Sequence, residues 1–282
     1  MKRKMTGSTE GLAVCDLLRQ RTMGCLRTWR AVALLGREEA ERMTGPLLTN
    51  VVDFSEPGRF DRTWLVACAR AKEARNKTRP KNLKMIEGDA DATHARLSPL
   101  LASLLERARA IHHAAAAEPS SSARETAARL FKLSANSGET KLAKGAGPCT
   151  SSFVLSHFAP SLVPFYCQKQ WEELALAVPA LRLAKDCKFN EAQGAVFYEC
   201  VLELVTIINE NADALPDEGP ESPATEENAG GAMEKITPLD VSNALWYARV
   251  KGPEVESKIW KEDAPNKKRK EGVNQNDNAV DK

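Results

Sequence analysis

Aromatic residues, net charge and long apolar runs are all scarce in this sequence. Aromatic residues make up only 6% of the 282 residues, whereas Ala, Leu, Glu, Lys and Arg are abundant, which favours helices over a β-sandwich or β-barrel. The formal net charge is only +2, so the chain as a whole lacks the basic excess typical of nucleic-acid-binding domains. No run of 18 apolar residues occurs, and Asp16 interrupts the apolar stretch near the N-terminus. We therefore expect neither a membrane span nor a secretion signal.

The cysteines show no pattern of a disulfide framework or a metal finger. The chain has seven of them and no CxxC pair: Cys15, Cys25, Cys68, Cys149, Cys167, Cys187 and Cys200. An odd count without regular spacing favours reduced thiols in a reducing compartment. We therefore expect an intracellular protein that has no bound metal and no cofactor.

The overall composition is that of a folded protein, with 43% apolar and 28% charged residues. We expect an all-α globular domain over residues 10–255, preceded by a flexible N-terminus at 1–9. Residues 214–235 are rich in Pro, Gly, Ser and acids, which predicts a flexible acidic loop inside this domain. Residues 256–282 are polar and predict a disordered basic tail.

Helix boundaries are indicated by capping and breaking residues. Residues 12–41 carry apolar positions at helical spacing, with Gly24 and Gly36 as expected breaks. Ser98 followed by Pro99 predicts the start of another helix. Residues 191–211 form the strongest amphipathic pattern, and Thr237-Pro238-Leu239-Asp240 predicts a capped helix.

Residues 70–84 contain seven basic side chains against the single acid Glu73. The basic residues are Arg70, Lys72, Arg75, Lys77, Arg79, Lys81 and Lys84. They can contact phosphates if they face the same side as a phosphate-binding loop, or they can form an ordinary solvated helix end.

A glycine-containing turn, Gly145-Ala146-Gly147-Pro148, separates two predicted helices. Glycines permit positive φ and close backbone approach, while Pro148 presets the first turn of the next helix. A backbone of this shape can aim N–H groups at a phosphate oxygen. The same residue pattern is also an ordinary way to connect two helices.

The stretch GAGPCTSSFVL, at residues 145–155, resembles the helix-hairpin-helix motif. VPFY, at residues 163–166, extends the resemblance toward the helix-hairpin-helix superfamily of DNA glycosylases. The resemblance covers about residues 141–167 and implies sequence-independent binding of a nucleic-acid backbone by hairpin amides. It places Cys149 where bifunctional members carry a catalytic Lys, and Tyr166 where the family carries a catalytic Asp. Glycosylase chemistry loses both groups, so the resemblance indicates a hairpin without catalysis.

The predicted interface consists of the hairpin with basic support from residues 70–84. Its members are Lys141, Lys144, Gly145, Gly147, Cys149, Thr150, Arg70, Lys72, Arg75 and Lys77. The expected partner is a DNA or RNA backbone, and no membrane. Two alternatives stay open: a glycosylase-like enzyme whose acid is displaced to Asp186, Glu199 or Glu203, and a helical module for protein interaction with neither site.

Three further groups have both a chemical and an ordinary interpretation. Cys149 at a helix N-terminus is a candidate reactive thiol with His157 as its base, or a small buried side chain. The pair His112-His113 lacks a second ligand pair at metal spacing. Glu199 and Glu203 can share a proton or a metal, or form a solvated helix flank.

A compact basic cluster lies near the C-terminus, at Lys267, Lys268, Arg269 and Lys270. Together with Lys2-Arg3-Lys4 it resembles a nuclear-import signal. We therefore expect residence in the nucleus rather than in the cytoplasm.

Overall fold

The computed structural model describes residues 23–44, 59–73, 75, 79–118, 122–178, 181, 187–211 and 235–252. Every regular element in these ranges is helical, which confirms the all-α prediction. The α-helices are α2 (Met23–Thr44), α3 (Arg62–Glu73), α4 (Pro80–Glu87), α5 (His94–Ala117), α6 (Ala123–Ser134), α7 (Pro148–Phe158), α8 (Gln168–Ala177), α10 (Glu191–Glu210) and α11 (Pro238–Lys251). A 3₁₀ turn, η2 (Gly138–Thr140), precedes the hairpin. The predicted acidic loop, both terminal segments and the basic cluster at 267–270 lie outside the described residues.

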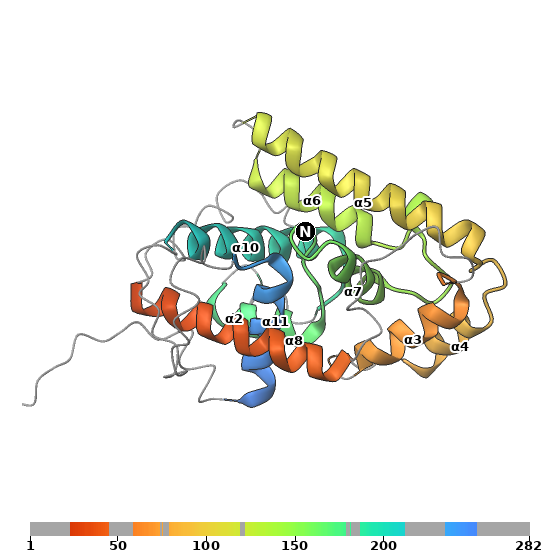
Figure 1. The fold of residues 1–282 in the computed structure, drawn as a ribbon, viewed down its shortest axis with the longest axis horizontal. Helices are drawn as coiled ribbons and strands as arrows, with labels where there is room; N and C mark the ends of the chain where they lie inside the picture. Colours follow the sequence, from red (N-terminus) through yellow and green to blue (C-terminus); the bar gives the residue numbers. More distant parts are fainter. Residues whose placement is uncertain are drawn as a thin grey trace, which may run out of the picture.

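The helices pack around one continuous apolar core. Helix α10 lies against α6, while α11 lies against α2 and α8 (Figure 1). Aromatic side chains from α6, α10 and the segment between α7 and α8 meet in this core, where Phe131, Tyr166 and Phe197 are 1% exposed or less. Their rings meet at centroid distances of 5.7 Å for Phe131 and Tyr166 and 4.7 Å for Tyr166 and Phe197. The few aromatic residues of this chain are therefore concentrated in its core.

Several predicted helix boundaries are confirmed. Helix α10 begins after Asn190, whose side chain accepts the N–H of Gln193. Helix α11 begins after Thr237 with the predicted capping box, in which Thr237 and Asp240 each accept the other's backbone N–H. Local signals in the sequence therefore correctly predicted the helix at residues 191–211 and the start of the helix at Thr237-Pro238.

Two predicted boundaries are wrong. The helix expected to begin at Ser98-Pro99 begins at His94, with Pro99 inside it. The buried side chain of Leu97 gives the upstream turn a packing reason to form, despite the backbone donor that Pro99 lacks. Gly36 does not end α2, because α2 crosses α11 there: a Cβ on Gly36 would lie 2.8 Å from the carbonyl carbon of Asn243. Glycine at this position allows close helix packing. Gly24 is the second residue of α2, and the residues before Met23 lie outside the described part of the chain.

The basic run at residues 70–84 divides between two helices. It covers the end of α3 and most of α4, a short helix that the sequence reading missed. Arg75 is only 3% exposed and donates to the carbonyl oxygen of Ala40 and to Oδ1 of Asn243. Its guanidinium carbon lies 5.4 Å from the ring centre of Phe153. Burial lowers the pKa of Arg75 to about 10, so it stays charged at neutral pH and links distant helices in the core.

Candidate nucleic-acid interface

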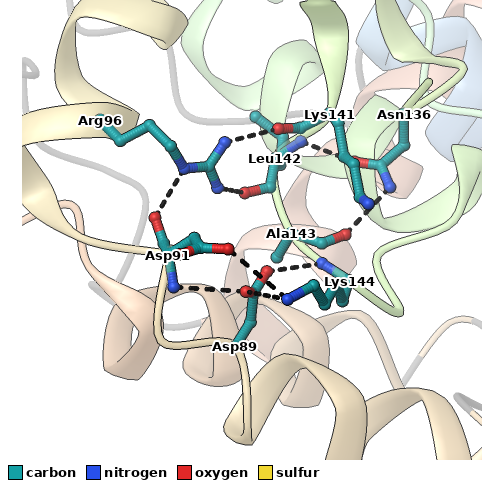
Figure 2. Close-up of polar contacts among 8 residues, drawn as sticks. All are labelled: Asp89, Asp91, Arg96, Asn136, Lys141, Leu142, Ala143 and Lys144. Carbon is teal, nitrogen blue, oxygen red and sulfur yellow. Dashed lines mark hydrogen bonds and ion pairs between the residues drawn. The ribbon is translucent and has the colours of Figure 1, made fainter. Parts of the chain in front are cut away.

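The hairpin, defined here as residues 141–147, is held in shape by side chains from α5 and from the segment that follows α6. Asn136, which follows α6, accepts the N–H of Leu142 at 2.7 Å and donates to the carbonyl oxygen of Ala143 at 3.1 Å. Arg96 of α5 donates to the carbonyl oxygens of Lys141, at 2.9 Å, and Leu142 (Figure 2). Leu142 and Ala143 are buried, so the first half of the hairpin is anchored to the core.

Asp89 fixes the middle of the hairpin to the α4–α5 connection. Its Oδ2 accepts the backbone N–H of Lys144 at 2.7 Å, and its Oδ1 accepts the N–H of Asp91 at 3.3 Å (Figure 2). Burial disfavours the charged form of Asp89, but these hydrogen bonds, together with the charges of Lys144 and Arg96, hold its pKa below the usual value. One hairpin amide is thus already bound to a carboxylate.

The Lys144 ammonium also faces acids. Its Nζ lies 3.7 Å from Oδ1 of Asp89 and 3.5 Å from Oδ2 of Asp91. These three residues line a pocket of about 460 Å³ together with Arg96 and Lys141. Both acids and bases therefore surround the hairpin, and part of the positive charge of Lys144 is compensated.

The turn itself presses against α4. Gly145 has φ +86°, and a Cβ there would lie 2.4 Å from the carbonyl oxygen of Asn82 and 2.7 Å from Cβ of Met85. Glycine is required at this position on both counts. Ala146 is 2% exposed and donates its N–H to the carbonyl oxygen of Ala143. The apolar residue between the two glycines therefore points into the core.

The second glycine behaves differently. Gly147 is the N-cap of α7 with φ −87°, and a Cβ there would meet no atom within 4 Å. No side chain caps this helix. Within the described part of the chain, the backbone N–H groups of Gly145, Gly147 and Thr150 donate no hydrogen bond. Unpaired N–H groups at a helix N-terminus are donors of the kind that bind anions, although Thr150 as a residue is only 4% exposed.

The predicted support residues are only partly at the surface. Lys141 and Lys144 are exposed, whereas Cys149 and Thr150 are buried. Lys72 and Arg75 are each 3% exposed, so their side chains are in the interior rather than at a phosphate-binding surface. Arg70 is exposed and pairs with Glu87 at 3.2 Å.

Lys77 lies outside the described residues. Lys81 and Lys84 are exposed on α4, the helix that touches Gly145. The later part of the basic run, rather than its centre, therefore lies beside the hairpin.

Cys149 and His157 do not form a catalytic pair. They lie eight residues apart in one helix, about 12 Å along its axis. The His157 Nδ1 lies 2.6 Å from the carbonyl oxygen of Phe153. Burial and the charge of Arg75 lower the pKa of His157 to about 3, so it is neutral at physiological pH. The buried-thiol interpretation of Cys149 agrees with its 9% exposure.

Two of the three alternative glycosylase acids, Glu199 and Glu203, line a pocket that includes neither Cys149 nor Tyr166. Tyr166 is fully buried, and its hydroxyl contacts the Cys187 sulfur at 3.3 Å. Glu199 pairs with Arg124 and lines a separate pocket of about 400 Å³ with Glu203. Neither Cys149 nor Tyr166 lines that pocket.

Burial raises the pKa of Glu199 despite the Arg124 charge. Asp186 lies outside the described residues. The two described candidate acids, Glu199 and Glu203, therefore share a pocket apart from Cys149 and Tyr166.

The two histidines of the His112-His113 pair lie in different environments. His112 contacts the carbonyl oxygen of Leu162 through Nε2 at 2.9 Å, whereas His113 is exposed. Among the described residues, no group of three or more His, Cys, Asp or Glu side chains is placed to hold a metal ion.

The residues that shape the hairpin were missed by sequence reasoning. Asp89 and Arg96 lie 55 and 46 residues before the hairpin positions that they bind. Only Asn136, six residues before Leu142, is close enough in sequence for a local signal.

Comparison of the chain with protein-family models, curated proteins and solved structures gave no match. None of the helices in the described ranges is long and apolar enough to cross a membrane.

Proposed function

We propose that this protein binds the DNA backbone without sequence preference and without catalysis, through the hairpin and the first turn of α7. The observation that supports this proposal is the set of backbone donors at Gly145, Gly147 and Thr150, for which the described residues supply no acceptor. A phosphate oxygen accepts such N–H groups, and the helix dipole of α7 favours its negative charge. The family resemblance of residues 145–155 points to the same ligand.

Exposed lysines beside the hairpin support the proposal. Lys141 and Lys144 lie on the hairpin, while Lys81 and Lys84 lie on the helix that contacts Gly145. Each lysine that reaches a phosphate releases counterions, which makes binding salt-dependent. Lys72 and Arg75, being buried, are not part of the proposed interface.

The absence of catalysis in this proposal rests on the two positions that would carry it. Cys149 is a thiol in place of an amine nucleophile, and Tyr166 is a buried phenol in place of a carboxylate. Burial raises the pKa of Tyr166 further above its ordinary range, so it stays neutral and does not stabilise a cationic sugar. The proposed role is therefore binding, with nuclear residence through Lys267 to Lys270 as an accompanying proposal.

Fluorescence anisotropy of a labelled DNA duplex across a salt series tests the proposal. We expect binding at low salt whose logarithm falls linearly with the logarithm of salt concentration. Replacing Lys141 and Lys144 by Gln should reduce the magnitude of this slope by about 0.9 for each phosphate contact removed. The matched control is Lys169→Gln, which removes an exposed lysine from α8. Absence of binding at low salt, or an equal effect of the control, would remove the proposal.

A further inference from the structure

A second surface feature lies between α5 and α6, which run side by side (Figure 1). It is a groove of about 480 Å³. Its floor is formed by Ile111 and Leu133, which are 7% and 2% exposed. Ala110 and Ala114 of α5 also line it, and their small side chains leave room above the floor. A volume in the range of roughly 300–1,000 Å³ is typical of ligand pockets.

Every charged residue that lines this groove is basic. These residues are Arg107, Arg129 and Lys132, and all three are exposed. Arg129 makes no ion pair with any described residue. The groove therefore combines an apolar floor with a positively charged edge.

Two of the cations already contact carboxylates of this chain, which shows that the edge accommodates acids. Arg107 lies 4.0 Å from Glu139, whose side chain is 93% exposed. Lys132 lies 3.0 Å from Glu191, whose side chain is 57% exposed. Exposed pairs of this kind contribute little to stability, so an incoming acidic group can replace them at small cost.

We propose that this groove docks an amphipathic helical segment of a partner protein, with leucine-like side chains on the floor and Asp or Glu residues against Arg107, Arg129 and Lys132. An apolar helix face buried between two helices is a common mode of peptide recognition. Complementary charges at the edge add specificity and accelerate association. A nucleic-acid backbone would satisfy the cations but would gain little from the apolar floor. The observations therefore favour a peptide.

The proposal does not depend on DNA binding by the hairpin. The groove is lined by residues of α5 and α6, and none of them belongs to the hairpin or to the first turn of α7. Variants in one place therefore leave the other intact, and the two functions can fail separately.

The test uses the full chain and a fluorescein-labelled synthetic helix of about 16 residues, with Leu at positions i, i+3, i+4 and i+7 and Glu elsewhere. A second peptide carries Lys in place of Glu, and a third carries Ala in place of Leu. We expect anisotropy to report a Kd of about 10–100 µM for the Leu/Glu peptide and binding at least about tenfold weaker for the other two. The methyl signal of Ile111 should shift only with the Leu/Glu peptide.

Ala110→Glu places a bulky negative side chain at the edge of the groove while changing an exposed helix position that is compatible with folding. We expect it to weaken peptide binding by about tenfold or more. Ser103→Glu is the matched control, because it adds the same charge to an exposed position of α5 that does not line the groove. Gly147→Ala, in the hairpin, should leave peptide binding unchanged.

Four outcomes obtained without DNA overturn the proposal, and a fifth is obtained with a DNA duplex. The first is no binding of the Leu/Glu peptide up to about 1 mM, and the second is equal affinity of that peptide for the Ala110→Glu variant and the unchanged protein. The third is equal affinity of the protein for the Lys peptide and the Leu/Glu peptide. The fourth is an Ile111 methyl shift that depends on protein concentration alone. The last result would assign the groove to a second copy of this chain. A DNA duplex that shifts the Ile111 methyl signal would assign it to nucleic acid instead.

Discussion

Helices α7 and α11 both begin with proline, at Pro148 and Pro238, yet the residue before each proline differs. Thr237 caps α11 by accepting the Asp240 N–H, and Asp240 accepts the Thr237 N–H in return. Asp240 also binds Arg37 through two 2.7 Å contacts. The N-terminus of α11 is thus satisfied within the chain.

The N-terminus of α7 has no comparable closure. Gly147 carries no side chain to cap it, and the N–H of Thr150 has no acceptor among the residues described. Capping by Ser or Thr usually stabilises a helix by about 1 kcal/mol relative to an uncapped end. Side chains cap α6, α10 and α11, whereas α7, like α4 and α5, lacks a side-chain cap. The comparison shows that the N-terminus of α11 is closed within the chain, whereas the first turn of α7 has donors without an acceptor among the described residues, which the proposed function assigns to a phosphate.

The largest expected effect on stability comes from a substitution that breaks the capping interactions at the N-terminus of α11. Asp240→Ala removes the partner of Arg37 and one half of the capping box in a place where Asp240 is 3% exposed. We expect the free energy of unfolding to fall by about 3–5 kcal/mol, because a partly buried guanidinium loses its carboxylate. Urea unfolding followed by tryptophan fluorescence measures this. Asp91→Asn serves as the control for an exposed aspartate, and a loss below about 1 kcal/mol for Asp240→Ala would contradict the role assigned to the capping box.

The next effect distinguishes the two glycines of the hairpin. Gly145→Ala forces a Cβ against the Asn82 carbonyl oxygen at φ +86°, so we expect a loss of about 1–3 kcal/mol in the free energy of unfolding. Gly147→Ala meets open space and should change stability by about 1 kcal/mol or less. Thermal unfolding of both variants measures the difference. An equal loss of stability in the two variants would show that Gly145 does not pack closely against α4.

Local signals explain which parts of this molecule could be predicted. The stripe of α10 and the Thr237 cap involve residues within one or two helical turns, and both were predicted from sequence, whereas the equally local cap at Asn190 was not. The start predicted for α5 at Ser98-Pro99 was wrong. The preference of Pro99 for the first turn of a helix was outweighed by the burial of Leu97, which lies upstream.

The candidate interface was less predictable because its geometry depends on distant residues. The glycine turn and its lysines could be read locally, but the burial of Lys72 and Arg75 depends on how α2, α7 and α11 pack around them. Nothing in the sequence near Lys144 indicates that Asp89 binds its amide. A run of basic residues in the sequence therefore does not show which of its side chains are exposed, because tertiary packing determines that.

Adding a side-chain cap to the N-terminus of α7 should change DNA binding and stability in opposite directions. Gly147→Ser supplies a hydroxyl that can accept the Thr150 N–H, as Thr237 does for Asp240. We expect stability to rise by a few tenths of a kcal/mol, whereas duplex affinity should fall by about tenfold because that donor is occupied. Anisotropy and urea unfolding on the same preparation measure both.

Gly147→Ala is the matched control for this substitution, since it adds the Cβ without the acceptor. Unchanged duplex affinity in Gly147→Ser, alongside increased stability, would identify residues 145–148 as an ordinary connection between helices.

The smallest expected effect concerns the acids beside the hairpin. Asp91 is 73% exposed in its side chain and lies 3.5 Å from the Lys144 ammonium, so under the proposed function it would compete with a phosphate for that charge. Exposed pairs contribute about 0.2–1 kcal/mol, and we therefore expect Asp91→Asn to raise duplex affinity about two- to fivefold at low salt. The gain should shrink as salt screens the pair, while the free energy of unfolding stays nearly constant. Glu118→Gln removes one negative charge from the far end of α5 and controls for net charge. An equal gain in that variant would mean that Lys144 has no local role, since only the overall charge of the protein would then matter.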